Sequence, residues 1–194
     1  MIHIIFVVDV SKSMSGSKIE SALETMRELS DSSHNLYSII TFANRENTIC
    51  EYIRFDHELL KKINVTSGLS NINTAMSKVK QLLEKYKKPS VLLCLTDSLF
   101  SSSFLNSKID NSLLLDKIIV SYTTTNLTQF YSKDFSVFHN DEKGLKEISS
   151  RIMERANSIE ETKNNEENEE KSVNVSETSE EEDLNFDKDD PKWN

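Results

Sequence analysis

The alternation of short apolar runs with amphipathic segments constrains the fold of this chain more than any other feature. Three runs are almost unbroken, which is typical of strands that are covered on both faces of a parallel sheet. These runs are 2–10, 90–96 and 113–120. Three other segments repeat apolar residues at the helical period, namely 18–30, 71–86 and 142–158. We therefore predict an α/β fold, with a doubly wound, mostly parallel sheet and helices on both faces.

Two further strands are expected to form an antiparallel edge of this sheet. Segments 36–43 and 48–55 flank the short polar connection 44–47, which fits a hairpin. A short last strand is expected at 135–138 and a helical turn at 127–131.

Two helix starts carry capping signals. Ser17 followed by Glu20 resembles a capping box, in which each side chain accepts from the backbone N–H of the other residue. Asp56 can cap a short helix that follows it.

Negative charge is concentrated at the C-terminal end. The chain has a formal net charge of −9, and residues 160–194 contain 14 acidic and 4 basic residues. A segment of this composition buries too little apolar surface to offset chain entropy. We therefore predict one folded domain over 1–158 and an acidic, disordered tail over 159–194. The rest of the chain lacks a basic stripe that could follow a phosphate backbone, which argues against nucleic acid as the main ligand.

No membrane association is expected. No run approaches the roughly 20 apolar residues that span a bilayer. The first ten residues lack a basic leader and a small-residue cleavage site, so we expect a cytoplasmic protein.

Three polar loops carry hard oxygen ligands. The first contains Asp9, Ser11 and Ser13 and follows the first strand, the second contains Ser70 and precedes a long helix, and the third contains Asp97 and follows the strand 90–96. Loops at the carboxyl ends of strands in a doubly wound sheet share one crevice, where ligands bind. Carboxylates and hydroxyls together suit Mg²⁺, which prefers oxygen ligands and retains waters.

These loops resemble the metal-ion-dependent adhesion site of von Willebrand factor A domains. The family's Asp-x-Ser-x-Ser motif falls on Asp9, Ser11 and Ser13, and its second Asp falls on Asp97. Ser70 stands where the family usually has Thr, and Ser98 stands where it usually has Gly. The order of the three loops along the chain also matches the family.

The resemblance implies a protein-binding module that holds Mg²⁺ or Mn²⁺. Ser11, Ser13 and Ser70 would coordinate the cation directly, while Asp9 and Asp97 would mostly hold bound waters. A carboxylate of the partner protein would complete the shell. The compact layout is similar to bacterial TerY-type proteins of tellurium-resistance and stress clusters, which implies a kinase or a phosphatase as a partner.

Three alternatives stay open. One is an adaptor for a MoxR-type AAA+ ATPase. Another is an aspartate-based phosphatase, although Ser11 occupies the position where that chemistry usually has its general acid, so we do not expect an enzyme. In the third, the acidic tail binds a basic partner or blocks the chain's own metal site.

Overall fold

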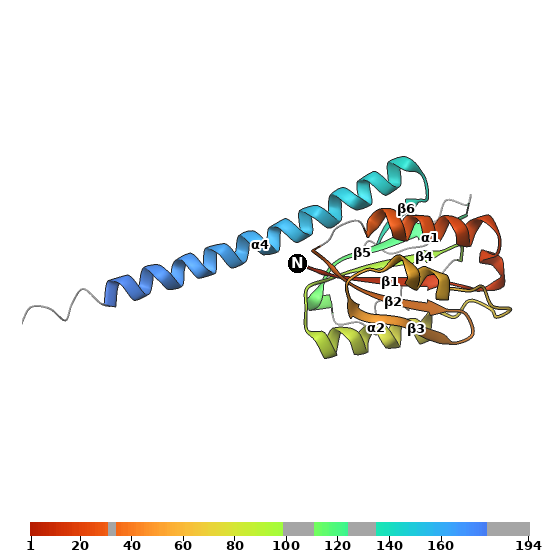
Figure 1. The fold of residues 1–194 in the computed structure, drawn as a ribbon, viewed down its shortest axis with the longest axis horizontal. Coiled ribbons are helices and arrows are strands. Elements are labelled where there is room, and N and C mark those ends of the chain that lie inside the picture. The colour runs from red at the N-terminus through yellow and green to blue at the C-terminus, as the bar shows by residue number, and fades with distance from the viewer. Residues whose placement is uncertain (31–33, 99–110, 124–134, 178–194) are drawn as a thin grey trace, which may run out of the picture. The chain divides into compact units, whose positions relative to one another are not determined.

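The computed structural model describes residues 1–30, 34–98, 111–123 and 135–177. Within these residues, six strands form one sheet with the order β3-β2-β1-β4-β5-β6 (Figure 1). The strands are β1 (His3–Asp9), β2 (Leu36–Phe42), β3 (Glu46–Ile53), β4 (Ser90–Thr96), β5 (Leu114–Ser121) and β6 (Ser136–His139). All neighbouring pairs are parallel except β2 with β3, so the antiparallel strand lies at an edge. The predicted mostly parallel sheet is confirmed.

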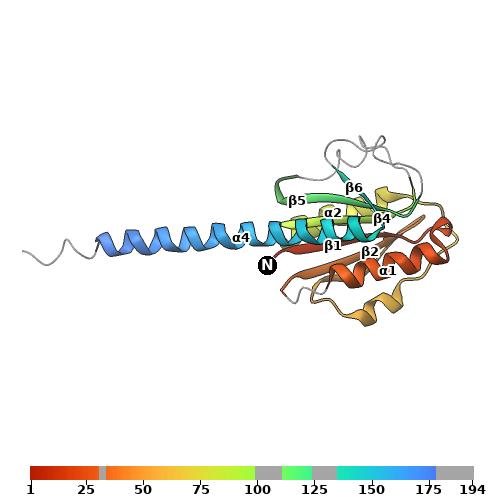
Figure 2. The same ribbon diagram turned by 90° about the horizontal axis from the view of Figure 1, so that it is seen from above.

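Helices cover both faces of this sheet, as predicted. They are α1 (Ser17–Leu29), α2 (Ile72–Tyr86) and α4 (Glu142–Glu177), with short 3₁₀ turns η1 (Lys12–Met14), η2 (His57–Lys62) and η3 (Asn111–Leu113). Figure 1 shows α1 and α2 on opposite sides of the sheet, and Figure 2 shows α1 and the beginning of α4 on the same side. The apolar side of α2 packs on inward residues of β1, β2 and β4, such as Val7, Ile40 and Cys94. The central strand β1 is buried along its whole length because both faces are covered.

The helix starts differ from one another in how well the sequence predicts them. Asp56 caps η2 as expected, since its carboxylate accepts from the N–H of Glu58 at 2.9 Å. The capping box at α1 is not formed. Gly16 is the N-cap, its φ of +74° lies in the region that favours glycine, and Ser17 is already the first helical residue.

The chain divides into two compact units, Met1–Ala156 and Asn157–Asn194. Helix α4 continues to Glu177, so the structure differs from the predicted disorder over 159–177. The physical reason is that this stretch contains no Gly or Pro and has seven Glu and two Lys residues, which favour a helix even where no apolar surface is available for packing. The remaining tail, 178–194, and the expected helical turn at 127–131 lie outside the described residues.

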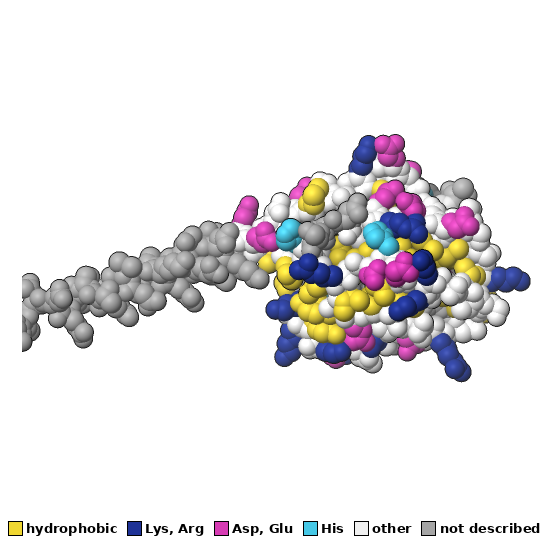
Figure 3. Space-filling view, viewed as in Figure 1, with side chains coloured by type: hydrophobic (Ala, Val, Ile, Leu, Met, Phe, Trp, Pro, Cys, Tyr) yellow, Lys and Arg dark blue, Asp and Glu magenta, His cyan; other side chains and the backbone are white. Residues whose placement is uncertain are grey.

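The surface of the domain carries charges of both signs. On the face in Figure 3, Lys and Arg side chains are interspersed with Asp and Glu rather than gathered into one field. Among the helices that the structure describes, none is both long enough and apolar enough to cross a membrane.

Candidate metal centre

The site begins at the carboxyl ends of β1 and β4, which are neighbours in the sheet. Val8 pairs with Leu95 in parallel register, so Asp9 and Thr96 end their strands side by side. Both residues are fully buried. The loops that follow, 10–16 and 97–98, therefore start from the same edge of the sheet, as the sequence predicts.

Asp9 is the buried centre of the site. Its Oδ1 accepts a hydrogen bond from the N–H of Ser11 at 2.9 Å. Its Oδ2 accepts from the hydroxyls of Ser70 at 2.9 Å and Thr96 at 2.7 Å, with the Ser98 hydroxyl at 3.3 Å. Within the part of the chain that the structure describes, no Lys, Arg or His pairs with this carboxylate. A buried charge is therefore compensated here by dipoles alone.

Asp97 forms the outer side of the site. Its Oδ1 accepts from Ser13 Oγ at 2.9 Å, and Ser13 Oγ lies 3.1 Å from Ser11 Oγ. Its Oδ2 lies 2.5 Å from Lys18 Nζ, on the first turn of α1. The structure thus connects all five of the predicted residues through hydrogen bonds.

Backbone contacts hold the second loop against the first. Lys12 N donates to Gly68 O at 3.3 Å, and Thr66 N donates to Val10 O at 2.7 Å. Leu69 N donates to Asn44 Oδ1 at 2.9 Å, which ties the same loop to the turn between β2 and β3. Gly68 fits this close approach because a Cβ there would lie 2.9 Å from Asn44 Cγ. Ser70 is therefore positioned by its neighbours and not only by its own hydrogen bond.

The donor set suits a hard cation and little else. The described residues contain no group of three or more His, Cys, Asp or Glu that could hold a metal ion. The site instead combines two carboxylates with three serine hydroxyls, all oxygen donors of the kind that Mg²⁺ and Mn²⁺ accept. Each hydroxyl can rotate so that a lone pair faces a cation while its hydrogen points elsewhere.

Three contacting residues were not among the predicted ligands. Thr96 and Ser98 donate to Asp9, and Lys18 pairs with Asp97. Thr96 could have been found as the strand-end residue that precedes Asp97. Lys18 gives no comparable signal, because its contact depends on where α1 begins.

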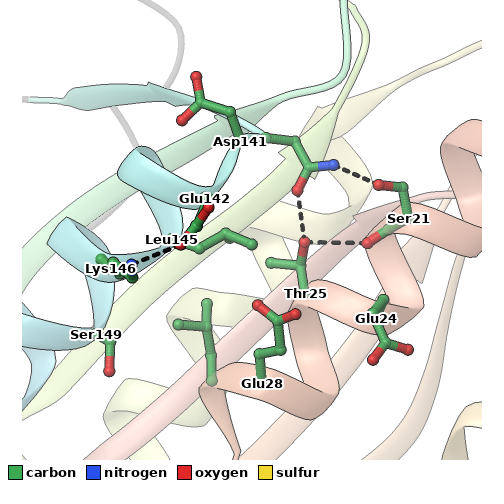
Figure 4. A pocket seen from close by; sticks show the side chains of 11 residues that line it. Ser21, Glu24, Thr25, Glu28, Asp141, Glu142, Leu145, Lys146 and Ser149 are labelled. Atoms are coloured by element: carbon green, nitrogen blue, oxygen red, sulfur yellow. Dashed lines mark hydrogen bonds and ion pairs between the residues drawn. The ribbon is translucent and has the colours of Figure 1, made fainter.

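Two cavities are lined in part by α1. One, of about 460 Å³, is lined by Lys18 together with residues at the ends of β5 and β6, including Tyr122, Thr123 and His139. The other, of about 450 Å³, lies between α1 and the beginning of α4 (Figure 4). In it, Thr25 Oγ1 donates to Asn140 Oδ1 at 2.8 Å and Asn140 Nδ2 donates to Ser21 Oγ. These bonds tie α1 to the segment that follows β6.

The comparisons with known proteins agree with this architecture. Residues 4–99 match the family model of the von Willebrand factor type A domain. No curated protein matches the chain by sequence. Among solved structures, proximal thread matrix protein 1 from the mussel byssus superposes with a TM-score of 0.57 at 16% identity, covering 78% of this chain and 45% of that one.

Two other solved structures are similar in the same way. The ArnB paralog VWA2 from Sulfolobus acidocaldarius gives a TM-score of 0.53 at 22% identity, covering 77% of this chain and 43% of that chain. BatB from Bacteroides thetaiotaomicron gives a TM-score of 0.57 at 14% identity, covering 81% of this chain and 100% of that chain. A further structure of the mussel protein has a TM-score of 0.57 at 15% identity, covering 78% of this chain and 45% of that chain. In that structure zinc occupies the metal-ion-dependent adhesion site (MIDAS) motif.

At these identities the likeness shows the fold. The chain spans less than half the length of the mussel and Sulfolobus proteins. Together with the sheet order, the match of residues 4–99 to the family model shows that the chain has an α/β fold like that of von Willebrand factor type A domains.

Proposed function

We propose that this chain is a metal-dependent protein-binding module, which holds Mg²⁺ or Mn²⁺ between the loops of Asp9, Ser70 and Asp97. The observation that carries the proposal is Asp9, a fully buried carboxylate that is surrounded by hydroxyls and has no cationic partner among the described residues. An unpaired buried charge is costly, and its retention is explained by a cation that compensates it.

The same donor set favours an external ligand. Three neutral hydroxyls and two carboxylates form too small a set to enclose a six-coordinate cation when the carboxylates hold it through waters. A position is then left for a group from outside, and a carboxylate is the ligand that a hard dication prefers. We therefore propose an acidic side chain of a partner protein as the ligand.

A relative of the same fold supports metal binding at this place. The mussel byssus protein holds zinc in its MIDAS motif, and its fold superposes on this chain. We further propose a bacterial stress or signalling complex as the setting, on the resemblance of the layout to TerY-type proteins.

The geometry of Asp9 also favours binding over catalysis. A nucleophilic carboxylate needs one oxygen free to attack a substrate. Asp9 Oδ1 accepts from Ser11 N and Asp9 Oδ2 accepts from two hydroxyls at 2.9 Å or less, and the side chain is buried. We therefore propose no phosphatase activity, and expect no turnover of p-nitrophenyl phosphate with Mg²⁺.

Metal binding is tested by calorimetric titration of Mn²⁺ into the chelator-treated full chain. Asp9→Asn and Asp97→Asn keep the side-chain shape and remove the charge, and each should weaken Mn²⁺ affinity by roughly 10–100-fold. Glu58→Gln removes an exposed carboxylate from η2 and serves as the control with unchanged affinity. Equal Mn²⁺ binding by wild type and both Asp variants would contradict the proposal.

Partner recognition is tested with a short peptide that contains one Glu and a matched peptide with Gln instead. The Glu peptide should bind measurably only when Mn²⁺ is present. Because coupling between two ligands is reciprocal, the peptide should raise the affinity of the chain for Mn²⁺ by the same factor by which Mn²⁺ raises its affinity for the peptide. Binding of both peptides in EDTA would contradict a carboxylate that completes the metal shell.

A further inference from the structure

Lys18 is the one cationic side chain that the described residues bring into contact with the candidate metal centre. Its Nζ lies 2.5 Å from Asp97 Oδ2, and the side chain is 40% exposed, whereas that of Asp97 is 5% exposed. Ser13 occupies the other oxygen of Asp97. Both oxygens of this carboxylate are therefore engaged.

We propose that Lys18 is a specificity-determining residue of the metal centre, an inference that rests on the proposed function. Without metal, its ammonium holds Asp97 in place and competes with the cation for it. With metal, the same ammonium supplies the positive charge that selects a partner carboxylate.

The charge balance explains the second role. Asp9 and Asp97 together balance a dication, because the serine hydroxyls are neutral. With the Lys18 ammonium included, the loaded site has a net charge of about +1, which a single external carboxylate neutralises. Without Lys18, the loaded site would already be neutral and would attract an external anion less strongly.

The position of Lys18 allows this contact. The side chain extends from the first turn of α1 to Asp97 and also lines the cavity of about 460 Å³. Its other lining residues carry hydroxyl, imidazole or amide groups, such as Tyr122 and His139, together with one carboxylate, Asp141. A partner segment that reaches the cation from this side passes the ammonium.

The first test measures Mn²⁺ affinity without any peptide. Lys18→Met should bind Mn²⁺ roughly 3–10-fold more tightly than wild type, because the competing charge is removed from a partly exposed pair. Lys61→Met removes the same charge from an exposed side chain on η2, outside the three loops of the site, and is the matched control with little change. Lys18→Gln is the second variant if Lys18→Met does not fold.

The second test measures how strongly the Glu peptide and Mn²⁺ favour each other's binding. This coupling should fall roughly 3–10-fold in Lys18→Met and stay near the wild-type value in Lys18→Arg, which keeps the charge. The proposal is overturned if Lys18→Met shows wild-type Mn²⁺ affinity and wild-type coupling while wild type binds both ligands. If wild type binds no Mn²⁺, the proposed function itself has failed.

Discussion

Replacing Thr96 with Val tests whether Asp9 is held by the hydroxyls around it. Thr96 is fully buried at the end of β4, and its hydroxyl donates to Asp9 Oδ2 at 2.7 Å. The Thr96 hydroxyl oxygen in turn accepts from the N–H of Ser98 at 3.0 Å. Valine has almost the same shape as threonine, so Thr96→Val removes both hydrogen bonds with little change in packing.

The expected loss of stability follows from these two contacts. A hydrogen bond to a charged group contributes about 1.5–3 kcal/mol, and an N–H left without an acceptor costs about 1–3 kcal/mol when buried. Ser98 is only partly buried, so water can satisfy part of the second loss. We expect the free energy of unfolding to fall by roughly 2–4 kcal/mol in Thr96→Val.

Urea unfolding of the chelator-treated protein measures this loss. With a slope of about 2 kcal/mol per molar urea, the midpoint should fall by roughly 1–2 M. Thr96→Ser keeps the hydroxyl and loses one buried methyl group, so it should cost only about 1 kcal/mol. If Thr96→Val is as stable as Thr96→Ser, the hydroxyl does not support Asp9 and the reasoning fails.

Two further substitutions test other parts of the account. Burial lowers the pKa of His3 from 6.5 to about 4, so the stability that the neutral ring contributes is present above pH 6.5 and is lost as the pH falls toward 4. Between pH 7 and pH 4.5, the urea midpoint of His3→Gln should therefore fall less than that of wild type. An equal fall of the two midpoints would contradict this. Gly68→Ala places a Cβ 2.9 Å from Asn44 Cγ and 3.0 Å from Asn44 N, so the loop that carries Ser70 must shift. It should lose about 1–3 kcal/mol of stability and bind Mn²⁺ more weakly, whereas Ser67→Ala at the exposed neighbouring position should do neither.

The fold could be predicted from the sequence because burial on both faces leaves a distinct apolar pattern. The continuous runs that contain Val7 and Cys94 lie at the centre of the sheet, where both faces are covered. The hairpin of β2 and β3 lies at the edge, as its polar connection indicates. The C-terminal helix was predicted from residue 142, but its continuation from 159 to Glu177 was not, because apolar periodicity reports packing and not helix formation by a Glu-rich sequence.

The juxtaposition of the three predicted loops also follows from the sequence, since parallel strands bring their carboxyl ends to one edge. The direction of individual side chains does not follow from the sequence. Whether the Thr96 hydroxyl points toward Asp9 depends on the register of β4 against β1. Lys18 reaches Asp97 only because α1 begins at Ser17 after the turn at Gly16, where a capping box at Ser17 was expected.

The most direct measurement is a crystal structure of the full chain grown with Mn²⁺ and recorded at an energy where manganese scatters anomalously. The account predicts one anomalous peak among the hydroxyls of Ser11, Ser13 and Ser70, with a coordination position open to an external ligand. A peak elsewhere, no peak at saturating Mn²⁺, or an ion fully enclosed by the chain's own groups would contradict it.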